Sequence, residues 1–167
     1  NTLSISPCYS LNSREDLFTN ALNLSSSGKF NLALEEWNSY LKLYPEDAAA
    51  LSNRGNVKLV MGDIQGSIDD QDKSINLDPN EVDPYINRGI AEEALGLWLL
   101  AKKDYNFVLS KESDNFSALY NYANVEGSLS NWEGARDLFS KAAKYNTGFA
   151  MARSSKALAE YQLGNID

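Results

Sequence analysis

The sequence predicts an all-α protein, a right-handed superhelical solenoid of antiparallel helix pairs. Three observations predict it. Glycines recur every 34 residues, other small and large residues keep the same register, and no useful stretch alternates with the period of two that is typical of strands. A fixed period of this length indicates a stack of similar helical hairpins, so we expect function to lie on the surfaces of the stack.

The turn inside each hairpin is the clearest column of the repeat. Glycine occupies four of its five positions and serine occupies the other: Gly28, Gly62, Gly96, Ser130 and Gly164. Glycine at this place supplies the positive φ with which the chain leaves the first helix of a pair. Two residues later every repeat carries a large apolar residue: Phe30, Ile64, Trp98, Trp132 and Ile166.

Small residues on both helices of a pair predict where the two helices touch. Seven residues before the turn stand Ala21, Gly55, Gly89, Ala123 and Ala157, and five residues after it stand Ala33, Ser67, Ala101 and Ala135. Helices approach closely only where Cβ atoms are small, so these columns are expected to face each other. A bulky residue follows in three units as Trp37, Tyr105 and Phe139, with Gln71 as the exception. Pro45 and Pro79 close the first two units, because the residue before a proline is pushed out of the helical region.

Together these columns resemble the tetratricopeptide repeat (TPR) family, whose unit is a pair of antiparallel helices with this small–small–aromatic–proline pattern. The resemblance covers residues 14–167, and it gives four full units followed by a half unit: 14–47, 48–81, 82–115, 116–149 and 150–167. In the third unit, for example, the expected helices span residues 83–95 and 98–111. The half unit is expected to form one lone helix that ends near Leu163.

Both ends of the chain are interpreted as cut from a longer protein. Residues 1–13 are polar and rich in serine, which is typical of a flexible N-terminal arm. At the other end, the second helix of the fifth unit would begin at Asp167. Three apolar side chains are then expected to be exposed where that helix would pack, and to favour a homodimer through the open C-terminal end: Leu158, Tyr161 and Ile166.

Composition argues against several classes of function. The formal net charge of −8 and the isoelectric point near 4.6 lack the positive field of a nucleic-acid-binding protein. The chain has no histidine and no phosphate-binding loop, and its single cysteine, Cys8, has no base beside it. Adjacent carboxylates such as Glu35 and Glu36 point about 100° apart on a helix, which favours a solvated face over an acid–base pair. We therefore expect no enzyme, cofactor, metal site, small-molecule substrate or nucleic-acid partner.

The best candidate site is a row of asparagines. The family resemblance implies that the first helix of each pair lines a concave groove, and Asn53, Asn87 and Asn121 recur there in register. Asn56 and Asn124 share that face one turn later. A carboxamide both donates and accepts, so such a row can hold the backbone of an extended peptide whose sequence hardly matters. The alternative is that these asparagines bond neighbouring helices or only solvate the groove.

Apolar residues on the same face suggest an anchor strip for a partner. Ile86, Ile90 and Tyr120 are the candidates for peptide binding, and others are less certain: Phe18, Leu22, Leu59, Leu158 and Tyr161. If the helices are rotated by one residue from the expected register, some of these side chains belong to the core instead.

A second family activity can be tested on the residues. TPR co-chaperones that hold the C-terminal carboxylates of Hsp70 or Hsp90 use two asparagines and two basic residues across three units. Here the basic positions of the first frame fall on Phe18, Asp83 and Asn87. Arg54 and Arg88 lie one residue away and are expected to point toward adjacent helices. Without cations the clamp loses its charge-assisted hydrogen bonds, so this activity is disfavoured.

Three hypotheses of function remain open. The leading one is a non-catalytic scaffold that binds an extended peptide or partner segment in the groove. The others are a homo-oligomerisation module and the regulatory arm of a larger enzyme. The Asn-Arg-Gly triplets at 53–55 and 87–89 resemble TPR proteins of plastids and cyanobacteria. That resemblance implies an assembly or regulatory factor of photosynthetic complexes in the chloroplast, at a thylakoid membrane complex; a cytoplasmic protein is the other expectation.

Overall fold

The computed structural model describes residues 13–146 and 150–164, and throughout these ranges the chain is helical with short turns and no strand. The helices are α1 (Arg14–Ser26), α2 (Phe30–Leu43), α3 (Ala48–Val60), α4 (Ile64–Leu77), α5 (Asp83–Ala94), α6 (Trp98–Lys111), α7 (Phe116–Ser128), α8 (Trp132–Tyr145) and α9 (Ala150–Gln162). The predicted all-α class is confirmed. Helix α5 ends one residue earlier than predicted, and α6 has the predicted bounds. Residues 1–12 of the predicted flexible arm and Ile166 lie outside the described residues, while Ser13, the last residue of the predicted arm, caps the N-terminus of α1.

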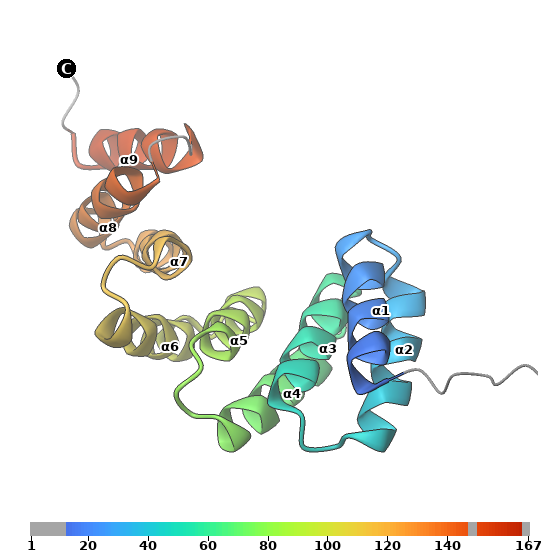
Figure 1. Cartoon of the computed structure of the whole chain (residues 1–167). Coiled ribbons are helices and arrows are strands. Elements are labelled where there is room, and N and C mark those ends of the chain that lie inside the picture. The colour runs from blue at the N-terminus through green and yellow to red at the C-terminus, as the bar shows by residue number, and fades with distance from the viewer. Residues whose placement is uncertain (1–12, 147–149, 165–167) are drawn as a thin grey trace, which may run out of the picture.

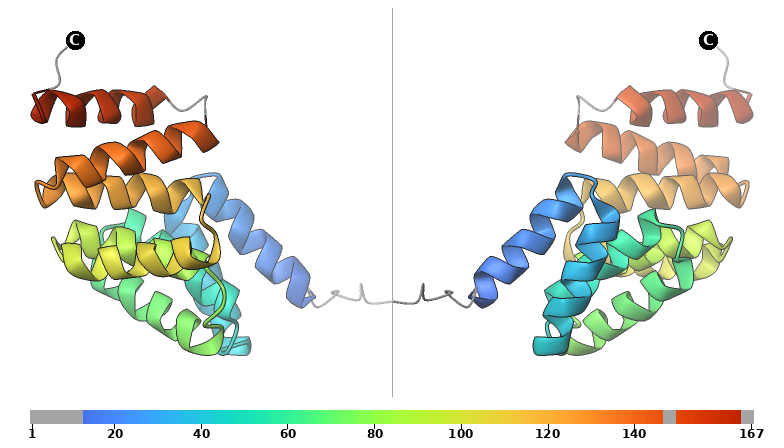
Figure 2. Two further views of the ribbon diagram at one scale, coloured as in Figure 1. Left: turned by 90° about the vertical axis from the view of Figure 1, so that its left-hand side faces the viewer. Right: turned by 90° about the vertical axis from the view of Figure 1, so that its right-hand side faces the viewer.

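Consecutive helices pair into hairpins, and the hairpins stack into a curved solenoid (Figure 1). Helices α3, α5 and α7 lie on the hollow side of the curve, where α3 contacts α5 and α5 contacts α7, while α4, α6 and α8 lie outside. The side views in Figure 2 show α5 to α9 as stacked layers, with α1 and α2 inclined to them. The inner helices therefore form a continuous concave surface.

The turn column adopts the predicted backbone. Gly28, Gly62, Gly96 and Gly164 have φ between +72° and +87°, and Ser130 has a φ of +60° in the same left-handed region. Serine at such a φ carries a steric cost of about 1–2 kcal/mol that glycine avoids. The fourth hairpin therefore keeps the repeat geometry even where its sequence departs from glycine.

In the second and third hairpins the small residue of the first helix lies against the bulky column of the second helix, and only at Gly55 is the small column also among the nearest atoms, through the backbone oxygen of Ser67 at 3.2 Å. A Cβ built on Gly89 would lie 2.7 Å from Cε1 of Tyr105, and one built on Gly55 would lie 2.6 Å from Nε2 of Gln71. Gln71 is the residue that interrupts the aromatic column, and it is fully buried. Its Nε2 donates to the backbone oxygen of Ser52 at 3.0 Å, so a hydrogen bond between α4 and α3 stands where the other units place a ring.

Within residues 13–146 and 150–164, α9 packs on α8 and no further helix covers its other side. Ala152 and Ala159 are buried against α8, whereas Leu158 and Tyr161 are 56% and 62% exposed, as the sequence predicts. No helix among the described residues is both long enough and apolar enough to span a lipid bilayer.

Candidate functional site

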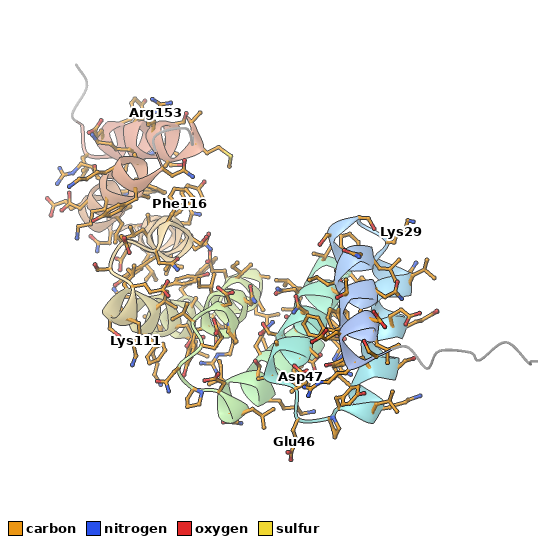
Figure 3. The ribbon with its side chains drawn as sticks, viewed as in Figure 1. Lys29, Glu46, Asp47, Lys111, Phe116 and Arg153 are labelled. Carbon is orange, nitrogen blue, oxygen red and sulfur yellow. The ribbon has the colours of Figure 1, made fainter. Side chains whose placement is uncertain are left out.

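A pocket of about 640 Å³ opens on the concave surface, across α3, α5 and α7. Ten of its fifteen lining residues carry amides, hydroxyls or carboxylates, and the other five are apolar. The lining residues are Ala48, Ala49, Ser52, Asn53, Asn56, Ser74, Asp78, Glu81, Asp83, Pro84, Ile86, Asn87, Ile90, Ser117 and Asn121. Figure 3 shows the side chains of these inner helices projecting into the hollow of the curve.

The structure brings the predicted asparagine row together at this pocket. Asn53, Asn87 and Asn121, one from each inner helix, all line it, and Asn56 lines it as well. The row exists because the residues lie 34 apart, so each occupies the same place on its helix. Asn124 is half-buried one turn beyond Asn121 and is not part of the lining.

The asparagines differ in how much hydrogen-bonding capacity they keep. Asn53 donates from Nδ2 to the backbone oxygen of Ala49 at 2.9 Å, within its own helix. Asn87 donates to Oγ of Ser52 at 3.2 Å, which joins α5 to α3. Asn56 accepts a long 3.5 Å bond from Gln71. The helix-bonding alternative thus holds for part of the capacity of Asn87 and Asn56, while each carboxamide has a second N–H or an oxygen lone pair left over.

The apolar candidates separate into groove and core. Ile90 lines the pocket and is 36% exposed, so it offers an apolar contact. Ile86 also borders the pocket but is only 7% exposed, because it packs in the core cluster with Val82 and Tyr105. The expectation that Ile86 is an exposed anchor is therefore wrong: it borders the pocket, but most of its side chain is buried. Tyr85 and Gly89 do not fill the core side of α5 by themselves, and Ile86 completes it.

Tyr120 lies away from the pocket lining. It is half-buried and packs on the ring of Phe139 at a centroid distance of 5.6 Å, between α7 and α8. Phe18 is likewise taken up by the core, edge-on to Trp37 at 5.0 Å. Leu22 keeps 38% exposure. Phe18 and Tyr120 occupy the same place in their repeats as Ile86. This position lies on the border between the groove face and the core face of the helix, so helical periodicity alone does not assign it to either.

The charged residues of the pocket are all acidic. Asp78, Glu81 and Asp83 come from the loop between α4 and α5 and from the first turn of α5, and no Lys or Arg lines the pocket. Sequence reasoning missed the loop pair Asp78 and Glu81, together with Ser52 and Ser117. The available signal was the loop Asp78-Pro-Asn-Glu81 itself, which must run along the edge of the groove if the inner helices line it.

Arg54 and Arg88 point away from the groove, as predicted. Arg54 makes two hydrogen bonds of 2.7 Å to the carboxylate of Asp70, and Arg88 makes the same pair of bonds to Asp104. Arg88 also reaches Asp72 of the preceding hairpin at 2.6 Å. These arginines fasten inner helices to outer ones, and they are unavailable to a carboxylate ligand in the groove.

No cluster of three or more acidic or cysteine side chains that could hold a metal ion occurs in residues 13–146 and 150–164. Among the pocket's described serines, the hydroxyl of Ser74 donates to the backbone oxygen of Ala48 and that of Ser52 accepts from Asn87. The lining offers hydrogen-bonding groups and negative charge to a ligand.

The fold and the repeat are shared with known proteins. A family model described as tetratricopeptide repeat matches residues 18–81 and 86–148, more than half of the chain. The tetratricopeptide repeat protein 36 of Danio rerio is 30% identical over 63 residues, which is 38% of this chain and 34% of that relative. The matched stretch thus spans about a third of the relative's length.

Solved structures agree at the level of fold. The structure of MamA matches with a TM-score of 0.78 at 20% identity, covering 90% of this chain and 82% of that one. YrrB, described as a TPR protein with an unusual peptide-binding site, matches with a TM-score of 0.74 at 18% identity, covering 95% and 81%. With its 34-residue register, its stacked hairpins and these matches, the chain belongs to the tetratricopeptide repeat family.

Proposed function

We propose that this chain is a non-catalytic interaction scaffold that binds an extended peptide segment of a partner protein along its concave groove. One observation carries the proposal. Asn53, Asn87 and Asn121 stand in a row on three consecutive inner helices around one pocket of about 640 Å³. No other polar side chain recurs at this pocket in the same register on all three helices.

The spacing of the row suits an extended backbone. Neighbouring packed helices lie roughly 8–10 Å apart, and an extended chain rises about 3.3 Å per residue. One asparagine then meets the peptide about every third residue. A carboxamide can bond the N–H and the C=O of one peptide unit, so the row holds the backbone and leaves the side chains of the ligand to other contacts.

The fold relatives support this reading. YrrB is described as having a peptide-binding site, and it shares the stacked-hairpin architecture with this chain. The absence of any Lys or Arg from the pocket lining disfavours the carboxylate clamp of co-chaperones, because a carboxylate there would meet other carboxylates.

A second candidate is homo-oligomerisation through α9. Leu158 and Tyr161 are each more than half exposed at the end of the stack, which favours a protein contact there. The finer proposal of an assembly factor for photosynthetic complexes depends on the Asn-Arg-Gly triplets at 53–55 and 87–89. The arginines of both triplets bond outer helices and their glycines permit helix contact, so packing accounts for two of the three residues in each triplet, and the asparagines line the pocket.

The test is selection of peptides from a displayed library of random, unstructured sequences. We expect peptides that bind the native chain and lose at least tenfold in affinity when Asn53, Asn87 and Asn121 are all changed to alanine. The matched control changes three exposed asparagines outside the pocket lining, Asn20, Asn23 and Asn31, to alanine, and it should keep the affinity. Circular dichroism should show the same helicity in all three proteins.

Two outcomes would contradict the groove. If the selected peptides bind the triple variant as well as the native chain, the asparagine row is structural. If instead no peptide is selected while the chain forms a dimer in sedimentation equilibrium, the open face of α9 becomes the working surface.

A further inference from the structure

The groove is charged with one sign only. Three carboxylates, those of Asp78, Glu81 and Asp83, lie along the edge of the pocket near the start of α5, and no cation lines it. The nearby basic residues of α3 and α5 are already engaged with carboxylates on the outer helices. Arg54 and Lys58 pair with Asp70 at 2.7 and 2.8 Å, and Arg88 pairs with Asp104. The hollow face is therefore left acidic because the arginines and lysine serve the packing behind it.

Local roles account for only part of this acidity. Asp83 stands in the first turn of α5, where a negative charge is favoured by the helix dipole. Asp78 accepts a hydrogen bond from the backbone N–H of Asn80 at 3.2 Å. Glu81 is exposed and has neither role, and within the described residues no ion pair is made by any of the three. Their charge is available to a ligand.

The floor of the pocket also offers a buried donor. Ser52 is 8% exposed and lines the pocket; its Oγ accepts from Asn87. Within the described part of the chain its hydroxyl hydrogen finds no acceptor, which leaves it free for a peptide carbonyl. This observation is independent of the carboxylates and points to a ligand that brings backbone acceptors into the same pocket.

We infer, on the basis of the proposed peptide-binding function, that the segment bound in this groove is cationic, with Lys or Arg side chains directed to the edge formed by Asp78, Glu81 and Asp83. Charge complementarity carries the inference: an anionic, partly enclosed cleft attracts cations and excludes acidic tails. The ligand is a Lys- or Arg-containing extended peptide.

The order of residues along α5 further defines the pattern of the peptide. Along α5 the carboxylate of Asp83 comes first, Asn87 lies about 6 Å further and Ile90 about 10 Å further, at 1.5 Å per residue. On α5, Asn87 thus lies between an acidic residue and an apolar one, whereas the positions equivalent to Ile90 on α3 and α7 are Asn56 and Asn124. Successive side chains of an extended peptide point to opposite sides, so one apolar residue, facing Ile90, is expected beside a basic residue in the bound segment.

The experiment uses the same library selection and two charge-matched variants. Glu81→Gln/Asp83→Asn removes two carboxylates from the pocket. Glu46→Gln/Asp114→Asn removes two from the loops that join α2 to α3 and α6 to α7, where both residues are exposed and neither lines the pocket; Glu46 points away from the hollow in Figure 3. Both variants change the net charge equally.

We expect the peptides that depend on Asn53, Asn87 and Asn121 to be enriched in Lys and Arg, with an apolar residue next to a basic one. Their affinity should fall about 5- to 20-fold in Glu81→Gln/Asp83→Asn and less than twofold in the Glu46 and Asp114 variant, and it should weaken as salt is raised. Peptides that depend on the asparagines but show no preference for basic residues, or lose equal affinity in both charge variants, would overturn the inference and leave the groove proposal standing. Peptides that do not depend on the asparagines would overturn both.

Discussion

The third hairpin, α5–α6, and the fourth, α7–α8, share the helix–turn–helix arrangement and are held together by different chemistry. In the third, Arg88 joins the inner helix to Asp104 on its outer partner and to Asp72 on the previous hairpin. The residues 34 positions later are Tyr122, Leu138 and Asn106. There Asn106 donates a neutral hydrogen bond of 3.2 Å to the hydroxyl of Tyr122 in place of the ion pair, and the ion pair between these two hairpins is made at another position, by Lys102 and Glu126 at 2.6 Å. The inner and outer helices of the third hairpin are thus joined by a buried ion pair. At the same positions of the fourth hairpin stand an aromatic ring and an apolar side chain.

Two buried glutamates at equivalent positions differ in the opposite way: the one in the fourth hairpin has charged and polar hydrogen-bond partners, and the one in the third has none among the described residues. Burial raises the pKa of Glu126 in the fourth hairpin, but Lys102 and Asn131 each donate to its carboxylate at 2.6 Å and the pKa is lowered overall. Glu92 is its equivalent in the third hairpin. Burial, and secondly the charge of Asp104, raise the pKa of Glu92 to about 7 in spite of Arg88 and Lys103, and its Oε2 has no hydrogen-bond partner.

The reason lies in two substitutions between the repeats. The positions that correspond to Lys102 and Asn131 are Ile68 and Leu97, neither of which can donate a side-chain hydrogen bond. Asn131 also caps α8 through Gly134, whereas Leu97 leaves α6 without a side-chain cap and is 42% exposed. The comparison teaches that small residues and turns set the repeat backbone, while the polar groups around it can be exchanged at a local cost in stability.

The largest expected effect comes from breaking the ion pair of the third hairpin. Arg88→Met leaves the carboxylate of Asp104, 5% exposed, buried without its partner. We expect a loss of about 3–5 kcal/mol in the free energy of unfolding, measured by urea denaturation. The double change Arg88→Tyr/Asp104→Leu copies the fourth hairpin and should recover most of that loss. If the single variant unfolds like the native chain, the ion pair does not fasten the hairpin.

The next largest effect is a difference between Glu92 and Glu126 in how their substitution changes stability with pH. The pKa of Glu92 rises from 4.5 in the unfolded chain to about 7 in the native one, so the native state prefers the protonated form. The stabilising contribution is full below pH 4.5 and is lost as the pH rises through 7. We expect Glu92→Gln to raise the unfolding free energy by about 2 kcal/mol at pH 8.5 and to change it little at pH 4.5.

Glu126→Gln is the matched control with the reverse sign. Because the pKa of Glu126 is lowered, its contribution is present above the unfolded pKa and disappears as the pH falls through the lowered value. The substitution should therefore destabilise the chain at pH 8.5. Equal pH profiles for the two variants, followed by urea unfolding, would show that the two sites do not differ in charge state.

The difference between the hairpins also marks how far the sequence could predict the molecule. Turn glycines and small residues determined the repeat because they act through sterics, which the period alone reveals. The place of Asn53, Asn87 and Asn121 followed from the same register. Tyr120 and Ile86 were assigned to the groove and lie mostly in the core, since a position on the border between two helix faces is decided by the size of its neighbours. The unpaired state of Glu92 depends on partners from two other segments and needed the packed structure.

The smallest effect is expected from a single substitution that supplies both a helix cap and a hydrogen bond to the buried carboxylate. Leu97→Asn gives the third hairpin the residue of the fourth, so its side chain can accept from the N-terminus of α6 and donate to Glu92, as Asn131 does for α8 and Glu126. We expect a gain of about 1 kcal/mol at neutral pH from the cap, with a lower pKa of Glu92 shown by a weaker pH dependence of stability. Asn131→Leu should lose a similar amount in the fourth hairpin. If Leu97→Asn instead destabilises the chain, the exposed leucine has a packing role that its 42% exposure conceals, and the two hairpins differ in more than their polar groups.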